Sequence, residues 1–242
     1  MDHETTVFMA RVADQAERYE DMVDFLTQMI KNKTEDCNVE ERNLLSVGFK
    51  NLIGSRRAAW RTVSAIEQNK KYEQYSDDCA QYKEKIEGEL VKQCELVISI
   101  VRDECLKKEC EAEAKTFYLK MIGDYYRYIS ESVQGDKLAE VGEAAADFYG
   151  QAETASDSLN PYNSIRLGLY LNYSVFYYEV KNDKKKACEL AQKALDDAKA
   201  HIEEMENEEA RDALSIVELL KENLDLWKED EEGDDNEKVE DL

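Results

Sequence analysis

The sequence has few of the residues that interrupt helices. Its 242 residues include one proline, Pro161, and nine glycines. Proline and glycine are the strongest local breaks in regular structure, so their scarcity leaves long segments uninterrupted. No segment shows the alternation of polar and β-branched apolar residues that is typical of strands. The sequence therefore predicts an all-α fold.

Motifs for catalysis and metal binding are also lacking. There are two histidines, His3 and His201, and the residue three positions before His201 is Ala198. This excludes the paired Glu-x-x-His motifs of a di-iron helical bundle. The sequence contains no H-E-x-x-H motif, no glycine-rich phosphate loop and no nucleophile elbow. We expect no catalytic residue, no metal site, no cofactor and no enzymatic activity.

None of the six cysteines stands in a C-x-x-C pair, which argues against a zinc or redox site. We expect free thiols in a reducing compartment, because a chain of this length needs no disulfides. The first ten residues lack the basic start and apolar run of a signal peptide. The longest apolar stretch, Leu96–Val101, is far shorter than the ~20 residues of a membrane span. The expected location is the cytoplasm, with the nucleus as a second compartment and no membrane insertion.

Basic side chains are in the minority. Lysine and arginine total 32 against 55 aspartates and glutamates, which gives a formal net charge of −23. This charge repels the phosphate backbone, so a general nucleic-acid-binding role is excluded. An anionic partner would require a local basic patch that opposes the global charge.

Helical periodicity runs through nearly the whole chain. Apolar residues at three- and four-residue steps predict one helix face over residues 12–30. Asn38 precedes two acidic residues of a first turn and is expected to be an N-cap. Further helices are predicted over about residues 38–66, 77–107, 111–134, 137–156, 163–180, 184–205 and 208–227. The short connections predict roughly nine antiparallel helices in a single domain, residues 1–227.

The last fifteen residues differ in composition. Residues 228–242 hold nine acids and two lysines, and almost nothing apolar. Such a segment cannot bury enough surface to offset the entropy of ordering it, so it is predicted to be a disordered acidic tail. Two interpretations of the tail stay open: it increases solubility, or its acids visit a basic groove and compete weakly with anionic ligands.

Two pairs of basic residues recur at the same spacing. Lys50 and Arg57 are seven residues apart, as are Lys120 and Arg127, so each pair shares a helix face. Arg61 follows the first pair, and Tyr128 follows the second. Each pair could be a solvated surface cluster. The alternative is an anion site, because arginine binds phosphate in a bidentate fashion and a tyrosine hydroxyl adds a donor.

Two later segments have apolar faces with one asparagine in each. In one interpretation these faces belong to the hydrophobic core, and the asparagine amides are hydrogen-bonded within the protein. In the other they form the wall of a groove that holds an extended peptide by its main chain and its apolar side chains. The first face comprises Leu171, Asn172, Val175 and Glu179, and the second comprises Ile216, Leu219, Asn223, Leu226 and Trp227.

Six runs of the sequence closely resemble the 14-3-3 family, in the family's order. They are AERYEDM (Ala16–Met22), ERNLLSVGFKN (Glu41–Asn51), GSRRAAWR (Gly54–Arg61), FYLKMIGDYYRY (Phe117–Tyr128), IRLGLYLNYSVFYYE (Ile165–Glu179) and ENLDLW (Glu222–Trp227). The resemblance implies nine antiparallel helices in a cup-shaped protomer with an amphipathic groove. It also implies a dimeric, non-catalytic adaptor that binds phosphoserine or phosphothreonine peptides and regulates phosphorylated client proteins in signalling.

The resemblance also implies roles for particular residues. The phosphate ligands would be Lys50, Arg57, Arg127 and Tyr128, flanked by Arg61 and Lys120. Two asparagines, Asn172 and Asn223, would bind the peptide main chain, with Glu179 nearby. The apolar groove wall would comprise Gly168, Leu171, Val175, Ile216, Leu219, Leu226 and Trp227.

The family forms its dimer from the first two helices of one protomer and the third and fourth helices of the other. The matching positions here are Val12, Ala16, Arg18, Asp21, Ala59, Tyr82, Lys85 and Glu89, with Arg18–Glu89 and Asp21–Lys85 as expected cross-protomer ion pairs. Rim pairs of this kind contribute only roughly 0–1 kcal/mol, so apolar packing should dominate. We expect a homodimer, with heterodimers with paralogues as a second form.

The chain departs from the family pattern in three places. Alanines, Ala58 and Ala59, follow the double arginine where many members have serines, so phosphorylation here should not open the dimer. The loop Leu159–Ser164 has one proline where many members have two. The stretches Asn69–Gln81 and Leu106–Cys110 match weakly and are expected to lie outside the groove.

A helical-repeat scaffold that binds unmodified acidic peptides is the alternative function. It would require self-similarity at a period near 34 residues, which the sequence does not show.

Overall fold

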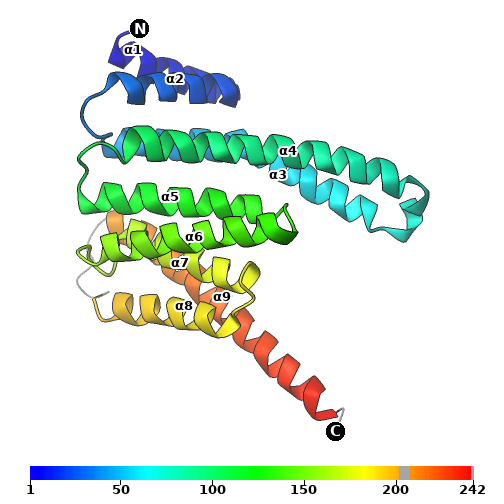
Figure 1. The fold of residues 1–242 in the computed structure, drawn as a ribbon. Coiled ribbons are helices and arrows are strands. Elements are labelled where there is room, and N and C mark those ends of the chain that lie inside the picture. Colours follow the sequence, from blue (N-terminus) through cyan, green and yellow to red (C-terminus); the bar gives the residue numbers. More distant parts are fainter. Residues whose placement is uncertain (202–207, 241–242) are drawn as a thin grey trace. The chain divides into compact units, whose positions relative to one another are not determined.

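The computed structural model describes residues 1–201 and 208–240. Over these residues the backbone forms helices and no β-strand (Figure 1), which confirms the all-α prediction. No helix in this described part is long and apolar enough to cross a membrane. The elements are α1 (His3–Gln15), α2 (Tyr19–Asn32), α3 (Val39–Glu67), the 3₁₀ helix η1 (Lys70–Tyr75), α4 (Ser76–Ile100), the π-helix η2 (Val101–Cys105), α5 (Ala112–Ser130), α6 (Gly135–Ser156), α7 (Ser164–Glu179), α8 (Lys184–Lys199) and α9 (Glu208–Glu240).

The chain folds as two compact units. The first comprises residues 1–110 and 128–141, and the second comprises residues 111–127 and the described part of 142–242. One boundary falls just before α5, and the other two fall inside α5 and α6. The sequence-based assignment of residues 1–227 to one domain therefore stays a prediction.

The apolar periodicity over residues 12–30 spans two helices, not one. After α1 the amide of Glu17 donates to the carbonyl of Asp14, and that of Arg18 donates to the carbonyl of Ala13. These two bonds form a Schellman motif, in which Glu17 takes the left-handed conformation with φ 54°. Glycine normally marks this position, so the sequence carried no stop signal.

The core of the first unit lies between α2, α3 and α4. Its buried side chains include Met22, Leu26, Ile30, Leu45, Phe49, Leu52, Ile53, Leu90 and Val97. At Gly48 of α3 an added Cβ would lie 2.8 Å from Leu26 Cδ1, so a glycine is needed for α3 to approach α2 this closely. This packing fixes α3, the helix that carries Lys50, Arg57 and Arg61.

The start of α3 is fixed as the sequence predicts. Asn38 Oδ1 accepts from the amide of Glu41, and the Glu41 carboxylate accepts from the amide of Asn38, which together form a capping box. Glu41 is 3% exposed and also binds Lys33 and His3. Burial alone would raise the pKa of Glu41, but the hydrogen bonds and charge of Lys33 and the Asn38 amide outweigh it and lower that pKa.

The helix predicted over residues 77–107 ends differently. The α-helical pattern of α4 stops at Ile100 and continues as the π-turn η2, where the amide of Leu106 donates to the carbonyl of Val101. The turn leaves Val101 and Cys105 buried. A π-turn has no distinct sequence signal, so periodicity alone did not separate it from α4.

The second unit packs α7 against α8 and α9. The buried side chains of α7 are Leu167, Leu169, Tyr170, Tyr173, Ser174 and Phe176. Tyr149 of α6 stacks on Tyr173 with ring centroids 5.1 Å apart. A Cβ added at Gly123 of α5 would lie 2.9 Å from the Tyr149 ring, so this glycine lets the ring fit against α5.

The loop before α7 is well anchored despite its single proline. Asn163 Oδ1 accepts from the amides of Ile165 and Arg166, and Asn163 Nδ2 donates to Glu113 Oε2 at 2.9 Å. Arg166 donates to the carbonyls of Ser156 and Leu159. An asparagine cap and an arginine therefore fix the loop conformation that the missing second proline left open.

The last helix runs past the predicted domain edge. Helix α9 continues to Glu240, where composition predicted a disordered tail over 228–242, and residues 241–242 lie outside the described residues. The hydroxyl of Tyr178 donates to Asp230, three residues after Trp227. Glutamate and lysine are good helix formers, so a composition that prevents burial does not prevent a helix. The helix predicted over residues 184–205 corresponds to α8. The last residues of that prediction fall within 202–207, which lie outside the described residues.

Candidate functional site

In the first unit, two arginines converge on one carboxylate. Arg57 Nη2 lies 2.6 Å from Glu131 Oε1 and 2.9 Å from Oε2, and Arg57 Nε lies 3.2 Å from Oε2. Arg61 Nη2 lies 2.9 Å from the same Oε2. The contacts of Arg57 are the bidentate geometry that guanidinium groups adopt with oxyanions. Arg57 and Arg61, two of the basic residues singled out in the sequence, therefore share one carboxylate, that of Glu131.

Tyr128 completes this cluster. The Arg57 guanidinium carbon lies 4.0 Å from the centroid of the Tyr128 ring, a cation–π contact. Lys50 is exposed on α3, two turns before Arg57. Thus the structure brings Arg57, Arg61 and Tyr128 together. It adds Glu131, which the sequence analysis missed.

In the second unit, four polar groups surround the buried carboxylate of Asp124. Lys120 Nζ lies 2.8 Å from Oδ2, while the Tyr149 hydroxyl and Asn172 Nδ2 lie 2.6 and 2.8 Å from Oδ1. Arg127 Nη2 lies 4.0 Å from Oδ1. Three residues with separately predicted roles, Lys120, Arg127 and Asn172, therefore share one partner.

The charges around Asp124 set its protonation state. Burial alone would raise the pKa of Asp124, but the charges of Lys120 and Arg127 and the hydrogen bonds from Lys120 and Tyr149 outweigh it and hold that pKa below its usual range. Burial and the neighbouring Asp124 charge raise the pKa of Tyr149 well above its usual value. Asp124 is therefore ionised and Tyr149 neutral at physiological pH.

Arg127 is a nearly buried cation. It is 7% exposed, and its Nε donates to the Tyr149 hydroxyl at 3.3 Å. A buried charge is tolerated only when it is paired and hydrogen-bonded, and Asp124 and Tyr149 meet that need.

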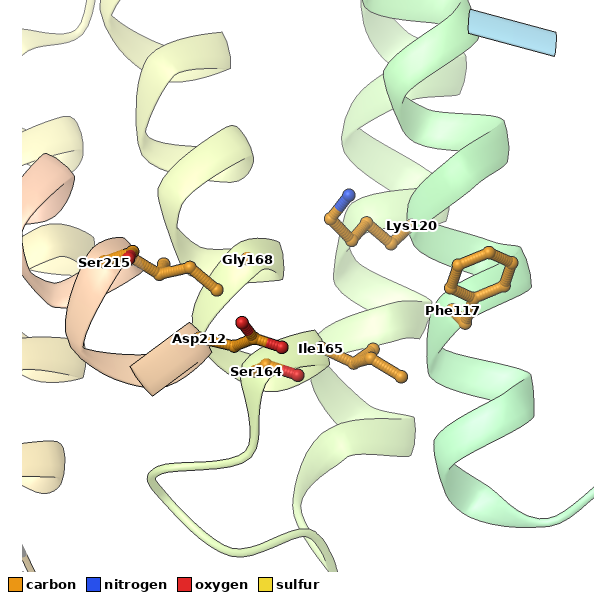
Figure 2. A pocket seen from close by; sticks show the side chains of 8 residues that line it. Phe117, Lys120, Ser164, Ile165, Gly168, Asp212 and Ser215 are labelled. Atoms are coloured by element: carbon orange, nitrogen blue, oxygen red, sulfur yellow. The ribbon is translucent and has the colours of Figure 1, made fainter. Parts of the chain in front are cut away.

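The predicted groove faces of α7 and α9 contribute to a pocket in the second unit. Its volume is about 430 Å³, and its lining includes the predicted residues Lys120, Gly168 and Ile216. Figure 2 shows Lys120 and Phe117 on α5, Ser164, Ile165 and Gly168 near the start of α7, and Asp212 and Ser215 on α9. The lining combines apolar side chains with one lysine and one aspartate.

The remaining residues that the sequence assigned to the groove differ in how exposed they are. Leu171, Asn172, Val175, Ile216 and Asn223 are half-buried, while Glu179, Leu219 and Leu226 are exposed. The buried positions of α9 are Ala213, Val217, Leu220, Leu224 and Trp227. Trp227 thus lies in the core, stacked on Tyr178 with ring centroids 4.8 Å apart, although the sequence assigned it to the groove wall.

Most of the chain matches one protein family. The match, to the family described as 14-3-3 protein, covers residues 9–228. The chain belongs to the 14-3-3 family. It is 44% identical to the 14-3-3-like protein GF14 psi of Arabidopsis thaliana over 240 residues, which cover 96% of this chain and 94% of the relative.

Relatives from other organisms are similarly close. The chain is 43% identical to 14-3-3 protein 7 of Solanum lycopersicum, over 98% of this chain and 96% of the relative. It is 43% identical to 14-3-3 protein 2 of Entamoeba histolytica, over 96% of this chain and 98% of the relative. Membership of the 14-3-3 family supports a general role as a phosphopeptide-binding adaptor of client proteins, in a family of non-enzymatic proteins.

The residues that match the 14-3-3 dimer interface lie in the first unit, on helices or, for Ala16 and Arg18, in the turn between α1 and α2. Val12, Ala16, Arg18, Tyr82, Lys85 and Glu89 are exposed, and Asp21 and Ala59 are half-buried. Within the single chain Arg18 pairs with Asp21, and Glu89 lies 3.7 Å from Arg56. A cross-protomer Arg18–Glu89 pair would therefore replace intrachain pairs, which reduces its net contribution.

Proposed function

We propose that this 14-3-3 protein is a dimeric adaptor for phosphoserine and phosphothreonine peptides. The observation that carries the proposal is the seat formed by Arg57 and Arg61, which already holds an oxyanion, the Glu131 carboxylate. A phosphate carries about −1.5 to −2 charges and three acceptor oxygens, so it is a stronger ligand for such a seat than a carboxylate. Family membership supports the same role in general.

The ligands of the phosphate in this proposal are those inferred from the sequence: Lys50, Arg57, Arg127 and Tyr128. The amides of Asn172 and Asn223 hold the peptide main chain, and the half-buried and exposed apolar residues of α7 and α9 contact its side chains. An unphosphorylated peptide brings no anion to compete with Glu131 for Arg57 and Arg61, which is the source of selectivity.

The proposed dimer adds avidity. With one groove in each protomer, a client phosphorylated at two sites binds both grooves when its linker spans them. The gain is on the order of 10²–10⁴ in apparent affinity. Homodimers, heterodimers with paralogues, a cytoplasmic and nuclear location and the absence of enzymatic activity belong to the same proposal.

The phosphate ligands are tested by charge reversal. Lys50→Glu and Arg127→Glu are each expected to abolish measurable binding of a fluorescent phosphoserine peptide that carries arginine upstream of the serine. Lys115→Glu changes the charge equally at an exposed position of α5 and is expected to bind normally. Fluorescence anisotropy gives the affinity, and circular dichroism checks the helices.

Arg127 is buried, so its substitution can affect folding. Lys50 is exposed, so Lys50→Glu is the variant expected to keep the fold. Tight binding by folded Lys50→Glu would contradict its assignment as a ligand.

A further inference from the structure

In the second unit, two buried residues, Asp124 and Tyr149, contact three residues that the sequence predicted to bind ligand. The sequence suggested no role for Asp124 or Tyr149 themselves. Asp124 is 7% exposed and Tyr149 is fully buried. Together they contact Lys120, Arg127 and Asn172. Lys120 and Arg127 are cations of the candidate phosphate site, while Asn172 is a candidate peptide-binding amide. The two buried residues thus link both kinds of recognition.

Asp124 fixes which way the Asn172 amide points. An ionised carboxylate only accepts hydrogen bonds, so the group 2.8 Å from Asp124 Oδ1 must be the NH₂ of Asn172. The Asn172 carbonyl oxygen is then directed away from Asp124, and one N–H of the amide is not used by Asp124. An amide held in this orientation offers both an acceptor and a donor, which match the N–H and C=O of a peptide main chain.

Tyr149 fixes Arg127 in a similar way. Its hydroxyl hydrogen is committed to Asp124 Oδ1 at 2.6 Å, so its oxygen lone pair accepts from Arg127 Nε at 3.3 Å. The tyrosine ring is itself immobilised by Tyr173 and Phe176, with centroids 5.1 and 5.6 Å away. Because Tyr149 holds Nε, the direction in which the Arg127 guanidinium points is set before a ligand binds.

We propose that Asp124 and Tyr149 are positioning residues for phosphopeptide recognition: they orient Arg127 toward the phosphate and fix the donor and acceptor that Asn172 presents to the peptide main chain. This inference rests on the proposed function and adds residues that touch no ligand. The advantage is preorganisation, because groups fixed before binding lose less entropy on binding.

Tyr149→Phe is the most direct test, because it removes one hydroxyl and changes neither charge nor ring packing. The matched control is Tyr170→Phe. Tyr170 is also buried in the second unit, and its hydroxyl also bonds a carboxylate, Glu153, and a cation, Lys193, but no candidate ligand residue. Affinities for the phosphorylated and unphosphorylated forms of one peptide are measured for each variant. Tyr149→Phe is expected to reduce the preference for the phosphorylated form about tenfold, and Tyr170→Phe less than about twofold.

Asp124→Asn tests the amide orientation. The new side chain has an NH₂ that can donate to Asn172, so the Asn172 amide can turn over. We expect a shift of the Asn172 side-chain amide resonance, identified from its loss in Asn172→Ala, together with weaker phosphopeptide binding. The matched control is Glu113→Gln, which alters another carboxylate–asparagine pair of the same unit, Glu113–Asn163. It is expected to leave the affinity unchanged.

The outcomes separate this inference from the proposed function. If the wild-type protein shows no preference for phosphorylated peptides, the proposed function fails and this inference fails with it. If the wild type prefers them and Tyr149→Phe retains the same preference as Tyr170→Phe, the inference alone is overturned. Because Tyr149→Phe keeps every charge, its result holds even if Asp124→Asn does not fold.

Discussion

At the scale of single residues, the candidate phosphate-binding arginines are held by acidic partners in the same unit. Arg57 contacts Glu131, and Arg127 contacts Asp124 and Tyr149. The two arginines differ in burial. Arg57, the partner of Glu131, is half-buried and next to exposed Arg61, whereas Arg127, the partner of Asp124, is nearly buried. We therefore expect Glu131 to compete with a ligand and Asp124 to support binding.

The competition by Glu131 gives the first prediction. Glu131→Gln should raise phosphopeptide affinity about fivefold, because a partly exposed ion pair worth about 1 kcal/mol no longer has to be broken. Glu140→Gln is the control, since Glu140 pairs with Lys137 in the same unit without touching the arginines. Isothermal titration calorimetry measures both. Unchanged or weaker binding by Glu131→Gln would mean that Glu131 does not compete.

Asp124 gives a prediction for the pH dependence of stability. Its folded-state pKa is lower than its usual value, so its charge stabilises the fold above the unfolded-state pKa, and that contribution is lost as pH falls through the folded-state pKa. The difference in unfolding free energy between wild type and Asp124→Asn should be largest at neutral pH and shrink below about pH 4. Urea titrations from pH 7 to pH 3 measure it, with Asp225→Asn, at an exposed position, as the control. A difference independent of pH would contradict this account.

Sequence reasoning found the basic residues of the site but not their acidic partners. Arginine is rare here, with ten in the chain, so the repeated seven-residue spacing of Lys50–Arg57 and Lys120–Arg127 carries information. Aspartate and glutamate total 55, so no spacing distinguishes Glu131 or Asp124 from the others. Only the fold shows which acid lies opposite which arginine.

At the scale of elements, the break between α1 and α2 is the feature that periodicity missed. Three residues separate the helices, and the apolar faces on both sides stay in phase, so the pattern of residues 12–30 looked continuous. By contrast, Asn38 gave a clear signal at the start of α3, because a side-chain cap is local and does not depend on tertiary structure.

The break predicts a stabilising substitution. Glu17 has φ 54°, a conformation that costs a non-glycine residue roughly 1 kcal/mol. Glu17→Gly should therefore raise the unfolding free energy by about 0.5–1 kcal/mol. Asp24→Gly is the control, because it removes the same charge from an exposed position inside α2 and should cost about 1 kcal/mol. Denaturant unfolding measures both, and a destabilised Glu17→Gly protein would show that the turn does not strain Glu17.

At the scale of the whole molecule, the proposed dimer accounts for two exposed apolar side chains of the first unit, Val12 and Tyr82. Val12 is 41% exposed and Tyr82 is 56% exposed. Both positions match the family's dimer interface. Burial of such groups against a second protomer would be favourable despite the net charge of −23 on each chain.

The dimer gives a prediction about charge at the interface. Ala59 is half-buried on α3, and Ala58 next to it is exposed. Ala59→Glu should shift the protein from dimer to monomer by burying an unpaired carboxylate, whereas Ala58→Glu should remain dimeric. Sedimentation velocity at micromolar concentration distinguishes the two masses. A wild-type monomer, or a dimeric Ala59→Glu protein, would contradict the interface.

The fold class was accessible from the sequence because helical periodicity extends over most of the chain, and the family was accessible because six matching runs are spread from Ala16 to Trp227. The tail was not, because its composition fits both a disordered segment and the helical backbone seen up to Glu240. The burial of Trp227 was not accessible either, since a three- and four-residue pattern does not say which of two adjacent faces is buried.

The proposed adaptor function requires that peptide binding depend on a phosphate group. Two fluorescent peptides identical except for phosphate on one serine, with arginine upstream, are titrated with the unmodified protein at physiological salt. The phosphorylated peptide is expected to bind at least about 100-fold more tightly, because charge-assisted bonds to arginine form only with the phosphate. Equal affinity for the two peptides would contradict it.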